Sequence, residues 1–569
     1  MRIHFPRKSR FRRYLTAKNY LYLLLAVVVL GSVYPLTADF YTKAEPREAL
    51  VARTMMEEGE YVLPQVYGEE TAYKPPMFHW FEVAATLFTG GEVTPLSARL
   101  PSAVALFVLA AGLFLFLSQR RPIPLALLAS LIFLTTLDPH RYGITARVDM
   151  LVTMFIVLAL FGLYRWDEAR EHRGLPWGAI LLMSGAFLTK GPVGVALPLL
   201  IFLVFGLVRR YPVGRLLLKL VAVGLLASVI PLVWYLLAWQ KGGEDFLQIV
   251  LNENILRFLG FEDDTLFYKL GHEGKFYKPL VYFFLGLIPW TFVVLFGRWQ
   301  GGMFKSLRDK PLALFALVAS VTTLVFYMIP MSKSSAYLLP MYPFAALWVA
   351  ETLYDLARDG SHRRLQGYVA LVFAAAALLL VAVILLHAGV DPSSVGLPRL
   401  DLFAEGLRLH FGLTLFGELL LVVGLLTILY QTVRKNYTKL LFATVFLVFI
   451  VHFVIDVPVM THYKETNSAR PFAREVRTTV GSEPLYVISD LRDGFFNLYG
   501  LAFYSEIRPV EFKVAKPDEG WLVIWEKDLD RLKETALQGY VPEVVKTDTR
   551  SIKEGGRAML LYVRKKDLK

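Results

Sequence analysis

Long apolar stretches separated by short basic connections constrain this chain more than any other feature. A membrane-spanning helix needs about 20 mostly apolar residues, and about thirteen segments approach this length. They lie near 18–37, 96–118, 122–138, 148–165, 175–190, 192–208, 216–238, 279–297, 311–330, 337–357, 366–388, 411–431 and 439–457. Of the 569 residues, 55% are hydrophobic and 19% charged, which excludes a soluble multidomain enzyme and a disordered chain. The sequence therefore predicts an all-α polytopic membrane protein.

The chain has a formal net charge of +13, and its basic residues are distributed according to the order of these spans. With the N-terminus in the cytoplasm, every connection on the cytoplasmic side is basic, as the positive-inside rule requires. The charge therefore indicates orientation and not a nucleic-acid partner. The apolar run at 20–36 is interpreted as an uncleaved anchor, because it is long, lacks a small-residue cleavage site and precedes many spans. The chain has no cysteine, which excludes disulfides and thiol chemistry.

Three long segments lie on the non-cytoplasmic side of the membrane, and the predicted domain boundaries follow from them. Residues 1–460 form the transmembrane domain, with outer loops at about 38–95 and 239–278. The first loop reads as an amphipathic helix at 45–58 and a short apolar helix at 77–89 lying on the membrane. Residues 461–569 form a small soluble α/β domain, with alternating stretches at 485–488 and 521–525, a helical stretch at 526–538 and a last apolar run at 558–563.

Ionisable side chains near the membrane are costly and usually functional, and here they gather on the face opposite the basic connections. They are Glu45, Arg47, Glu48, Lys74, His140, Arg141, Arg147, Asp149, Lys190, Glu253, Arg257, His272, Lys278 and Lys333. A few acids and several cations at one surface suit a substrate with a phosphate and a lipid portion. The sequence has no Walker A or Rossmann glycine pattern, which argues against an ATP-driven transporter.

Each of these residues also has a simpler interpretation. Lysines at helix ends extend toward water along the apolar surface, which would account for Lys74 and Lys190. Asp149 begins a span, where a carboxylate caps a helix or favours its dipole. Arg257 fits the polar side of an amphipathic helix, and His272 alone is more typical of a loop than of a metal site. Lys333 is the exception, since a lysine on the outer face opposes the positive-inside tendency.

Six short runs together resemble the bacterial GT-C glycosyltransferases of the aminoarabinose transferase and protein mannosyltransferase-like superfamily. The runs are 44–52, 59–64, 73–76 with Trp80, 147–150, 188–191 and 332–340, and the resemblance in topology covers about 1–460. The sequence departs from the family pattern at Ala44, where the family has Asp, and at Tyr73, where it has Glu. The thirteen spans and the C-terminal domain are also similar to the aminoarabinose transferases.

The resemblance implies a GT-C fold in the bacterial inner membrane, with a cytoplasmic N-terminus and a periplasmic C-terminal domain. It implies that a sugar passes from a polyprenyl-phosphate donor, undecaprenyl phosphate, to a periplasmic acceptor such as lipid A, with inversion. Membrane lipids are the other expected partners. The reaction must stabilise the leaving phosphate and orient or deprotonate the acceptor.

The residue roles that follow from this resemblance fall into three groups. Glu45 and Asp149 are the expected catalytic carboxylates. The donor phosphate is assigned to Lys74, Arg257 and Lys333, with Arg47 and Lys190 as weaker members. Further substrate contacts are assigned to Tyr73, Glu253, His272 and Tyr337. No cofactor is required, although a divalent metal, zinc or magnesium, stays open.

Three other functions remain compatible with the sequence. A protein O-glycosyltransferase of the mannosyltransferase type would have the same chemistry and a different acceptor. A transporter or flippase for lipid-linked sugars would also have many spans, but the odd span count, the large outer domain and the polar residues on one face argue against it. A polytopic assembly factor with a degenerate site is the third, and Ala44 keeps it open.

Overall fold

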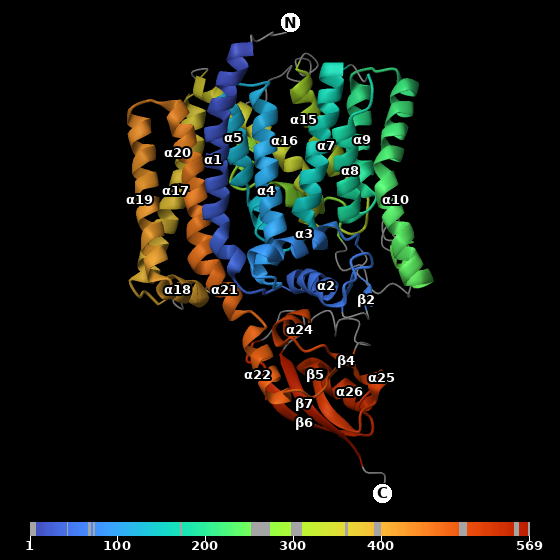
Figure 1. The fold of residues 1–569 in the computed structure, drawn as a ribbon. Coiled ribbons are helices and arrows are strands. Elements are labelled where there is room, and N and C mark those ends of the chain that lie inside the picture. Colours follow the sequence, from blue (N-terminus) through green and yellow to red (C-terminus); the bar gives the residue numbers. More distant parts are fainter. Residues whose placement is uncertain are drawn as a thin grey trace.

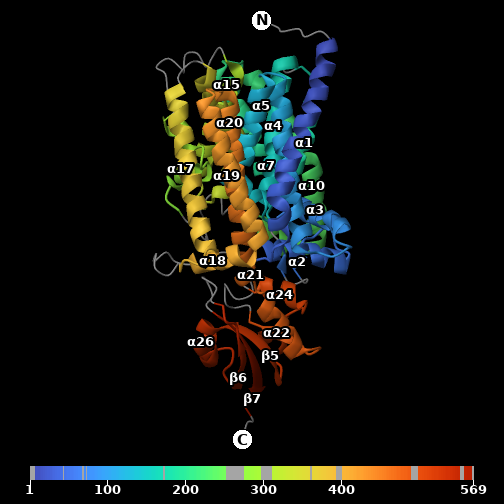
Figure 2. The same cartoon turned by 90° about the vertical axis from the view of Figure 1, so that its left-hand side faces the viewer.

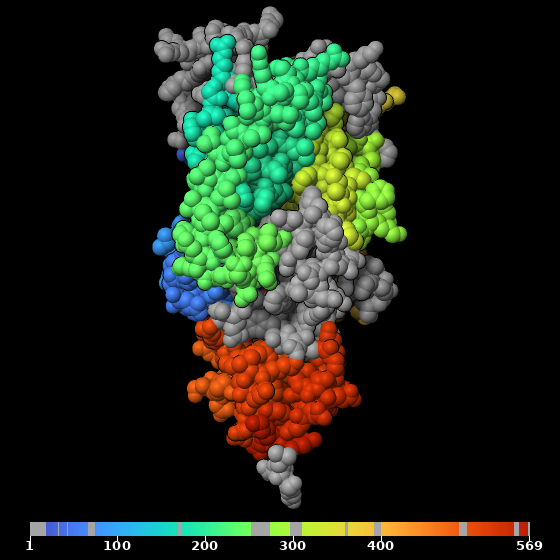
Figure 3. All heavy atoms as spheres, turned by 90° about the vertical axis from the view of Figure 1, so that its right-hand side faces the viewer, coloured from blue at the N-terminus to red at the C-terminus, as the bar shows by residue number. Residues whose placement is uncertain are grey.

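The computed structural model is a bundle of helices with a small lobe at one end. It describes residues 7–42, 44–66, 70–71, 74–170, 173–251, 274–296, 310–358, 362–391, 400–488, 498–550 and 557–566. Most helices lie side by side along one direction, and the N-terminus and the C-terminal lobe are at opposite ends (Figure 1). Figure 3 shows the lobe as a separate mass beyond the end of the bundle.

The bundle is built from the predicted apolar segments. Its first half contains α1 (Arg7–Thr37), α4 (Pro95–Ser118), α5 (Ile123–Leu134), α6 (Leu137–Gly143), α7 (Val148–Arg170), α8 (Trp177–Lys190), α9 (Val193–Val208) and α10 (Val213–Leu251). Its second half contains α12 (Lys278–Gly286), α13 (Thr291–Phe296), α15 (Pro311–Met328), η3 (Ser335–Met341), α16 (Tyr342–Arg358), α17 (His362–His387), α19 (Phe411–Val433) and α20 (Tyr437–Val454).

The predicted helical membrane protein is confirmed at this level, whereas the count of thirteen spans is not. Among the described residues, seven helices are long and apolar enough to cross a membrane, or eight if α5 and α6, bent by 66°, form one span. The helices α8 and α9 are shorter, with 14 and 16 residues. The segment predicted at 279–297 is divided into α12 and α13, and α10 continues to Leu251, well past the predicted end at 238.

Short elements lie across the end of the bundle that faces the lobe (Figures 1 and 2). They are α2 (Ala44–Glu58), β1 (Gln65–Val66), β2 (Glu70–Thr71), α3 (Met77–Ala85), η1 (Thr86–Phe88) and α18 (Leu400–Leu409). The predicted helix at 45–58 is α2, but it is buried on most sides, since Ala49, Leu50, Val51 and Ala52 are at most 1% exposed. After α3, Leu87 and Phe88 are 83% and 77% exposed, as expected for a segment lying on a membrane.

The lobe contains a five-stranded sheet of order β4-β3-β5-β7-β6. The predicted strands are β3 (Leu485–Val487), β5 (Glu519–Trp525) and β7 (Ala558–Lys565), while β4 (Val510–Glu511) and β6 (Tyr540–Thr547) were not predicted. The expected helical stretch at 526–538 is shorter, as η6 (Glu526–Asp528) and α26 (Leu529–Glu534). The pairs β3–β4 and β3–β5 are parallel, and β5–β7 and β6–β7 antiparallel.

The last span reaches this sheet through a series of helices that is interrupted only at 467–469. After α20 come η5 (Ile455–Met460), α21 (Thr461–Thr466) and α22 (Arg470–Val480). The predicted domain boundary at 460/461 lies within this connection. Alternate residues of β5 are buried on the two faces of the sheet. On one face, Val523 and Trp525 pack with α22 and α24 (Tyr499–Ser505). On the other face, Leu522 and Ile524 form a second core with Leu532.

A tight turn joins α8 to α9, as the sequence predicts at 189–192. Gly191 has a φ of +80°, which a residue with a side chain rarely adopts. Three residues later Gly194 touches the backbone of α8, where an added Cβ would overlap the backbone of Ala186 and Phe187. This close approach packs the start of α9 against the end of α8, which carries Lys190.

We expect Gly194→Ala to destabilise the protein by about 1–3 kcal/mol, because the methyl group must push α8 and α9 apart. Thermal unfolding in detergent measures this. Gly214→Ala is the matched control, since a Cβ at that helical glycine meets nothing within 4 Å. Equal unfolding temperatures for the two variants would contradict the close contact between α8 and α9.

Candidate functional site

Glu48 on α2 is the centre of a buried group of charges at the end of the bundle facing the lobe. Its side chain is 4% exposed and accepts hydrogen bonds from Arg47 Nη2 at 2.5 Å and Lys74 Nζ at 2.9 Å. His79 Nε2 lies 2.9 Å from its second oxygen. Burial alone raises the pKa of Glu48, but Lys74, Arg47 and His79 hold this pKa well below its usual range. Glu48 is therefore a carboxylate, and His79 donates to it.

Asp149 is the second carboxylate of this group. It lies in the first turn of α7, and Lys190 lies in the last turn of α8, so each charge is favoured by its own helix dipole. Because α7 and α8 are antiparallel neighbours, these two ends meet, and Lys190 Nζ lies 2.5 Å from Asp149 Oδ1. Arg147 Nε lies 3.0 Å from Asp149 Oδ2.

The two carboxylates and their partners form one charge cluster, made of Glu48, Asp149, Arg47, Lys74, Arg147 and Lys190. Lys74 interacts electrostatically with Asp149, and Arg147 with Glu48. Within the cluster the carboxylate side chains are 3–4% exposed, whereas those of the cations are 15–35% exposed. Counted over these six described residues alone, four cations and two carboxylates give a net charge of +2, and the cations are the more accessible members. This arrangement favours an anionic ligand.

Glu45, one turn earlier on α2, belongs to a different pair. Arg99 of α4 contacts it through Nε at 2.7 Å and Nη2 at 3.2 Å, and the backbone N–H of Ala146 donates at 3.1 Å. Both side chains are at most 1% exposed. Burial alone raises the pKa of Glu45, but Arg99 holds this pKa below its usual value.

Arg99 also connects Glu45 to the backbone after α1. Its guanidinium donates to the carbonyls of Pro35, Leu36 and Asp39, each at 3.1 Å, and to that of Ala38. Arg99 follows a capping box in which Thr94 and Ser97 bond each other at the start of α4. Glu45 thus contacts a structural arginine, and its predicted catalytic role stays a prediction.

Lys333 and Tyr337 lie between α15 and α16. The ammonium of Lys333 donates to the carbonyls of Met328 at 2.7 Å and Tyr327 at 3.3 Å, and to that of Pro330, so it caps the end of α15. The ring of Tyr337 stacks on Tyr327, with centroids 5.2 Å apart. Lys190 Nζ lies 4.6 Å from the Tyr337 ring centroid, which connects Tyr337 to the charge cluster by a cation–π contact.

Four predicted site residues, Tyr73, Glu253, Arg257 and His272, lie outside the described residues. Five of the others come together in the structure: Lys74, Arg47, Lys190, Asp149 and Tyr337.

Sequence reasoning missed part of the site. It counts Glu48 and Arg147 among the polar residues of this face without assigning them a role, and it does not mention His79 and Glu82 of α3. The sequence feature that could have indicated these two residues is the presence of an acid and a histidine in a short apolar helix. Burial raises the pKa of Glu82 well above its usual range, which favours the neutral form of this side chain.

Comparisons with known proteins agree with this geometry. The family model described as dolichyl-phosphate-mannose-protein mannosyltransferase matches residues 73–235, which include Lys74, Asp149 and Lys190. An undecaprenyl phosphate-alpha-4-amino-4-deoxy-L-arabinose arabinosyl transferase of Pectobacterium atrosepticum is 27% identical over 426 residues, covering 72% of this chain and 71% of that protein. An uncharacterised protein of Aquifex aeolicus is 28% identical over 355 residues, which cover 59% of this chain and 64% of the Aquifex protein.

The fold also matches a solved structure along nearly its whole length. The crystal structure of ArnT from Cupriavidus metallidurans bound to undecaprenyl phosphate superposes with a TM-score of 0.72 at 18% identity, covering 96% of this chain and 98% of that chain. The apo structure of the same protein gives a TM-score of 0.69. The resemblance to GT-C glycosyltransferases is therefore confirmed. The fold is the one seen in ArnT.

We expect Arg99→Gln to destabilise the chain by about 3–5 kcal/mol, because Glu45 would keep a buried charge without its cation. The yield of monodisperse protein and thermal unfolding in detergent measure the loss. The control is Arg531→Gln, whose partner Asp528 lies 3.4 Å away in an exposed pair, worth about 1 kcal/mol or less. If both variants unfold at the same temperature, the Glu45–Arg99 pair does not hold this end of the bundle together.

Proposed function

We propose that this chain is an inner-membrane glycosyltransferase that moves a sugar from undecaprenyl phosphate to a periplasmic acceptor, lipid A, with inversion. The observation that carries the proposal is the charge cluster, in which four partly accessible cations surround two buried carboxylates. A polyprenyl-phosphate leaving group gains negative charge as the sugar departs, and fixed cations stabilise that charge. The names of the arabinosyl transferase relatives and the undecaprenyl phosphate in the ArnT structure support this donor.

In this proposal the cations Lys74, Arg47, Arg147 and Lys190 hold the donor phosphate. Glu48 and Asp149 orient these cations, and Lys333 and Arg257 remain predicted members of the phosphate site. The side-chain cations supply the charge, so the proposal requires no cofactor. A zinc or magnesium ion at this site stays a prediction.

The basicity of Glu48 favours a particular kind of acceptor. Its pKa is held well below the usual range by Lys74 and Arg47, so this carboxylate is a poor base for a hydroxyl proton. A phosphate acceptor is already ionised and needs only positioning. This supports a lipid phosphate, as on lipid A, over the hydroxyl of a protein side chain.

An apolar cavity supports a place for the lipid part of the donor. It has a volume of about 200 Å³ and lies among α12, α13, α15 and α16, lined by Phe283, Val294, Leu324, Met341 and Trp348. Met341 ends η3, the short helix that carries Tyr337. The short helix η3 therefore contributes both to the cavity, through Met341, and to the charge cluster, through the contact of Tyr337 with Lys190.

We propose the finer topology on the same grounds: thirteen crossings, a cytoplasmic N-terminus and a periplasmic C-terminal domain. The N-terminus and the lobe lie at opposite ends of the bundle, which is consistent with an odd number of crossings (Figure 1). The charge cluster is at the end facing the lobe, and the basic connections of the positive-inside pattern are predicted at the other.

We expect Lys74→Met to lower kcat for transfer by about 10²–10³, the usual cost of losing one group that stabilises developing charge. Glu48→Gln and Asp149→Asn should also lower kcat, because each removes a carboxylate that orients the cations of the cluster. The assay uses purified enzyme with a polyprenyl-phosphate sugar and lipid A. Lys241→Met is the control, because Lys241 pairs with Glu60 at 2.5 Å in a partly exposed position outside the cluster. Full activity in all three cluster variants would contradict the proposed phosphate site.

The acceptor can be identified by mass spectrometry of outer-membrane lipids and glycoproteins from cells with and without this chain. We expect a sugar on lipid A that disappears with the chain. A change confined to glycoproteins would instead support the O-glycosyltransferase. Donor-dependent product in detergent, without a membrane barrier or gradient, separates an enzyme from a transporter.

A further inference from the structure

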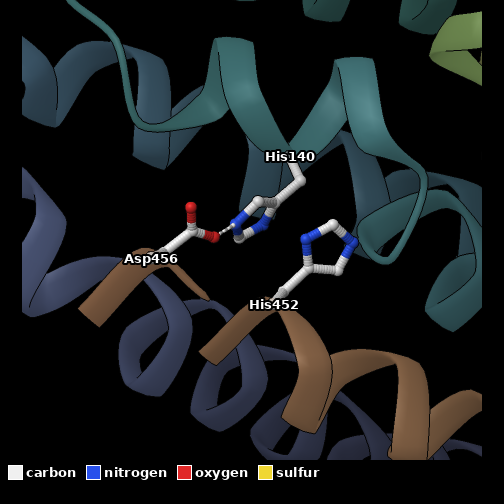
Figure 4. A group of neighbouring side chains, drawn as sticks. All are labelled: His140, His452 and Asp456. Carbon is white, nitrogen blue, oxygen red and sulfur yellow. Dashed lines mark hydrogen bonds and ion pairs between the residues drawn. The ribbon is translucent and has the colours of Figure 1, made fainter. Parts of the chain in front are cut away.

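Two histidines and an aspartate meet at a place separate from the charge cluster. They are His140 of α6, His452 of α20 and Asp456 of η5, and one ligand atom from each lies within 4.8 Å of the others (Figure 4). His140 Nε2 lies 2.6 Å from Asp456 Oδ2, and the centroids of the two imidazole rings are 4.5 Å apart. Imidazole nitrogen and carboxylate oxygen are ligands that zinc takes in proteins.

The hydrogen bond of His452 prepares it as a ligand. Its Nε2 lies 3.2 Å from the carbonyl oxygen of Thr135, which can only accept, so Nε2 carries the proton. In the neutral ring Nδ1 then has a lone pair, and this nitrogen is turned toward His140 (Figure 4). Histidine ligands of metals usually donate their other N–H to a carbonyl or carboxylate in this way, which fixes the tautomer and the ring orientation.

The backbone around Asp456 supports the same interpretation. His452 and Asp456 are four residues apart on one helical path, so their side chains lie on the same side. At Ile455–Met460 this path widens into a π-helical turn, a rare conformation that is found frequently at functional sites. His140 comes from α6, more than 300 residues earlier in the chain.

We propose that His140, His452 and Asp456 bind one divalent transition-metal ion, zinc by the nature of the ligands. Tetrahedral bonds of about 2.0–2.2 Å require donor atoms roughly 3.3 Å apart, so His140 and Asp456 separate slightly as the ion enters between them. His140 Nε2 releases its proton to solvent or moves it to Nδ1, since a ligating nitrogen must be unprotonated. A water molecule completes the coordination.

The ion would connect two distant parts of the fold. The loop after α6 leads to Arg147 and Asp149 of the charge cluster, while His452 and Asp456 lie on the segment that leads to the C-terminal sheet. Arg141, next to His140, donates to Ser335 Oγ at 3.1 Å on the side of η3. The ion would therefore hold α6 close to the segment of α20 and η5, and this inference is independent of the sugar donor and acceptor.

The test uses the full-length protein in detergent, purified through a tag without histidine and stripped with a chelator. Addition of Co²⁺ should produce the visible absorption of tetrahedral cobalt, and zinc analysis should give one equivalent per chain. Zn²⁺ should also raise the unfolding temperature. His452→Asn and Asp456→Asn should each lose the cobalt absorption and the zinc equivalent.

The matched control is His387→Asn. His387 Nδ1 lies 2.9 Å from Glu418, and the described part of the chain offers no third ligand there. This variant therefore removes a histidine–carboxylate pair and should keep full binding. Asp456→Asn retains the shape of the side chain and a hydrogen bond to His140, and size-exclusion chromatography verifies its fold. Absence of stoichiometric binding by the wild-type chain, or unchanged binding by the folded Asp456→Asn variant, would overturn the proposal.

Discussion

Buried charge at the junction of α2, α7 and α8 is the constraint on which the rest of the site depends. The carboxylates Glu48 and Asp149 are almost fully shielded from water, and an uncompensated charge in such a place is very costly. Their compensation comes from cations on other elements: Lys190 from the end of α8 and Lys74 from the segment before α3. The antiparallel pairing of α7 and α8 therefore matters for function, because it brings Asp149 and Lys190 together.

The same physics gives two nearby carboxylates of α2 different environments. Glu45 contacts Arg99, which also holds the backbone carbonyls after α1, whereas Glu48 contacts cations that remain partly accessible. The first arrangement holds the chain in place, and the second can receive a ligand. A carboxylate whose partners are all internal is suited to a structural role, and one behind accessible cations is suited to an anionic substrate.

The C-terminal lobe supports the site from the other side. It contacts the start and the middle of the α2 region: Arg53 Nη1 donates to the carbonyl of Phe503 at 2.8 Å, and Tyr504 Oη accepts from the backbone N–H of Phe40 at 2.7 Å. The helix that carries Glu48 is thus held between the bundle and α24, and it shares a core with both. The sequence predicts the C-terminal lobe as a separate domain, but in the structure this lobe helps to hold Glu48 in position.

Hydropathy and charge pattern by themselves determined the class of this protein, because the cost of burying polar groups in a membrane is a local property of each segment. Strands β3, β5 and β7 follow from local alternation in the same way, and the family motifs indicated Lys74, Asp149 and Lys190. Tertiary structure alone decided that Glu48 belongs to the charge cluster and Glu45 to Arg99, and that His140 meets His452 and Asp456. The reason is physical: the energy of a buried charge or a ligand group depends on partners that are tens to hundreds of residues away, and no local pattern contains them.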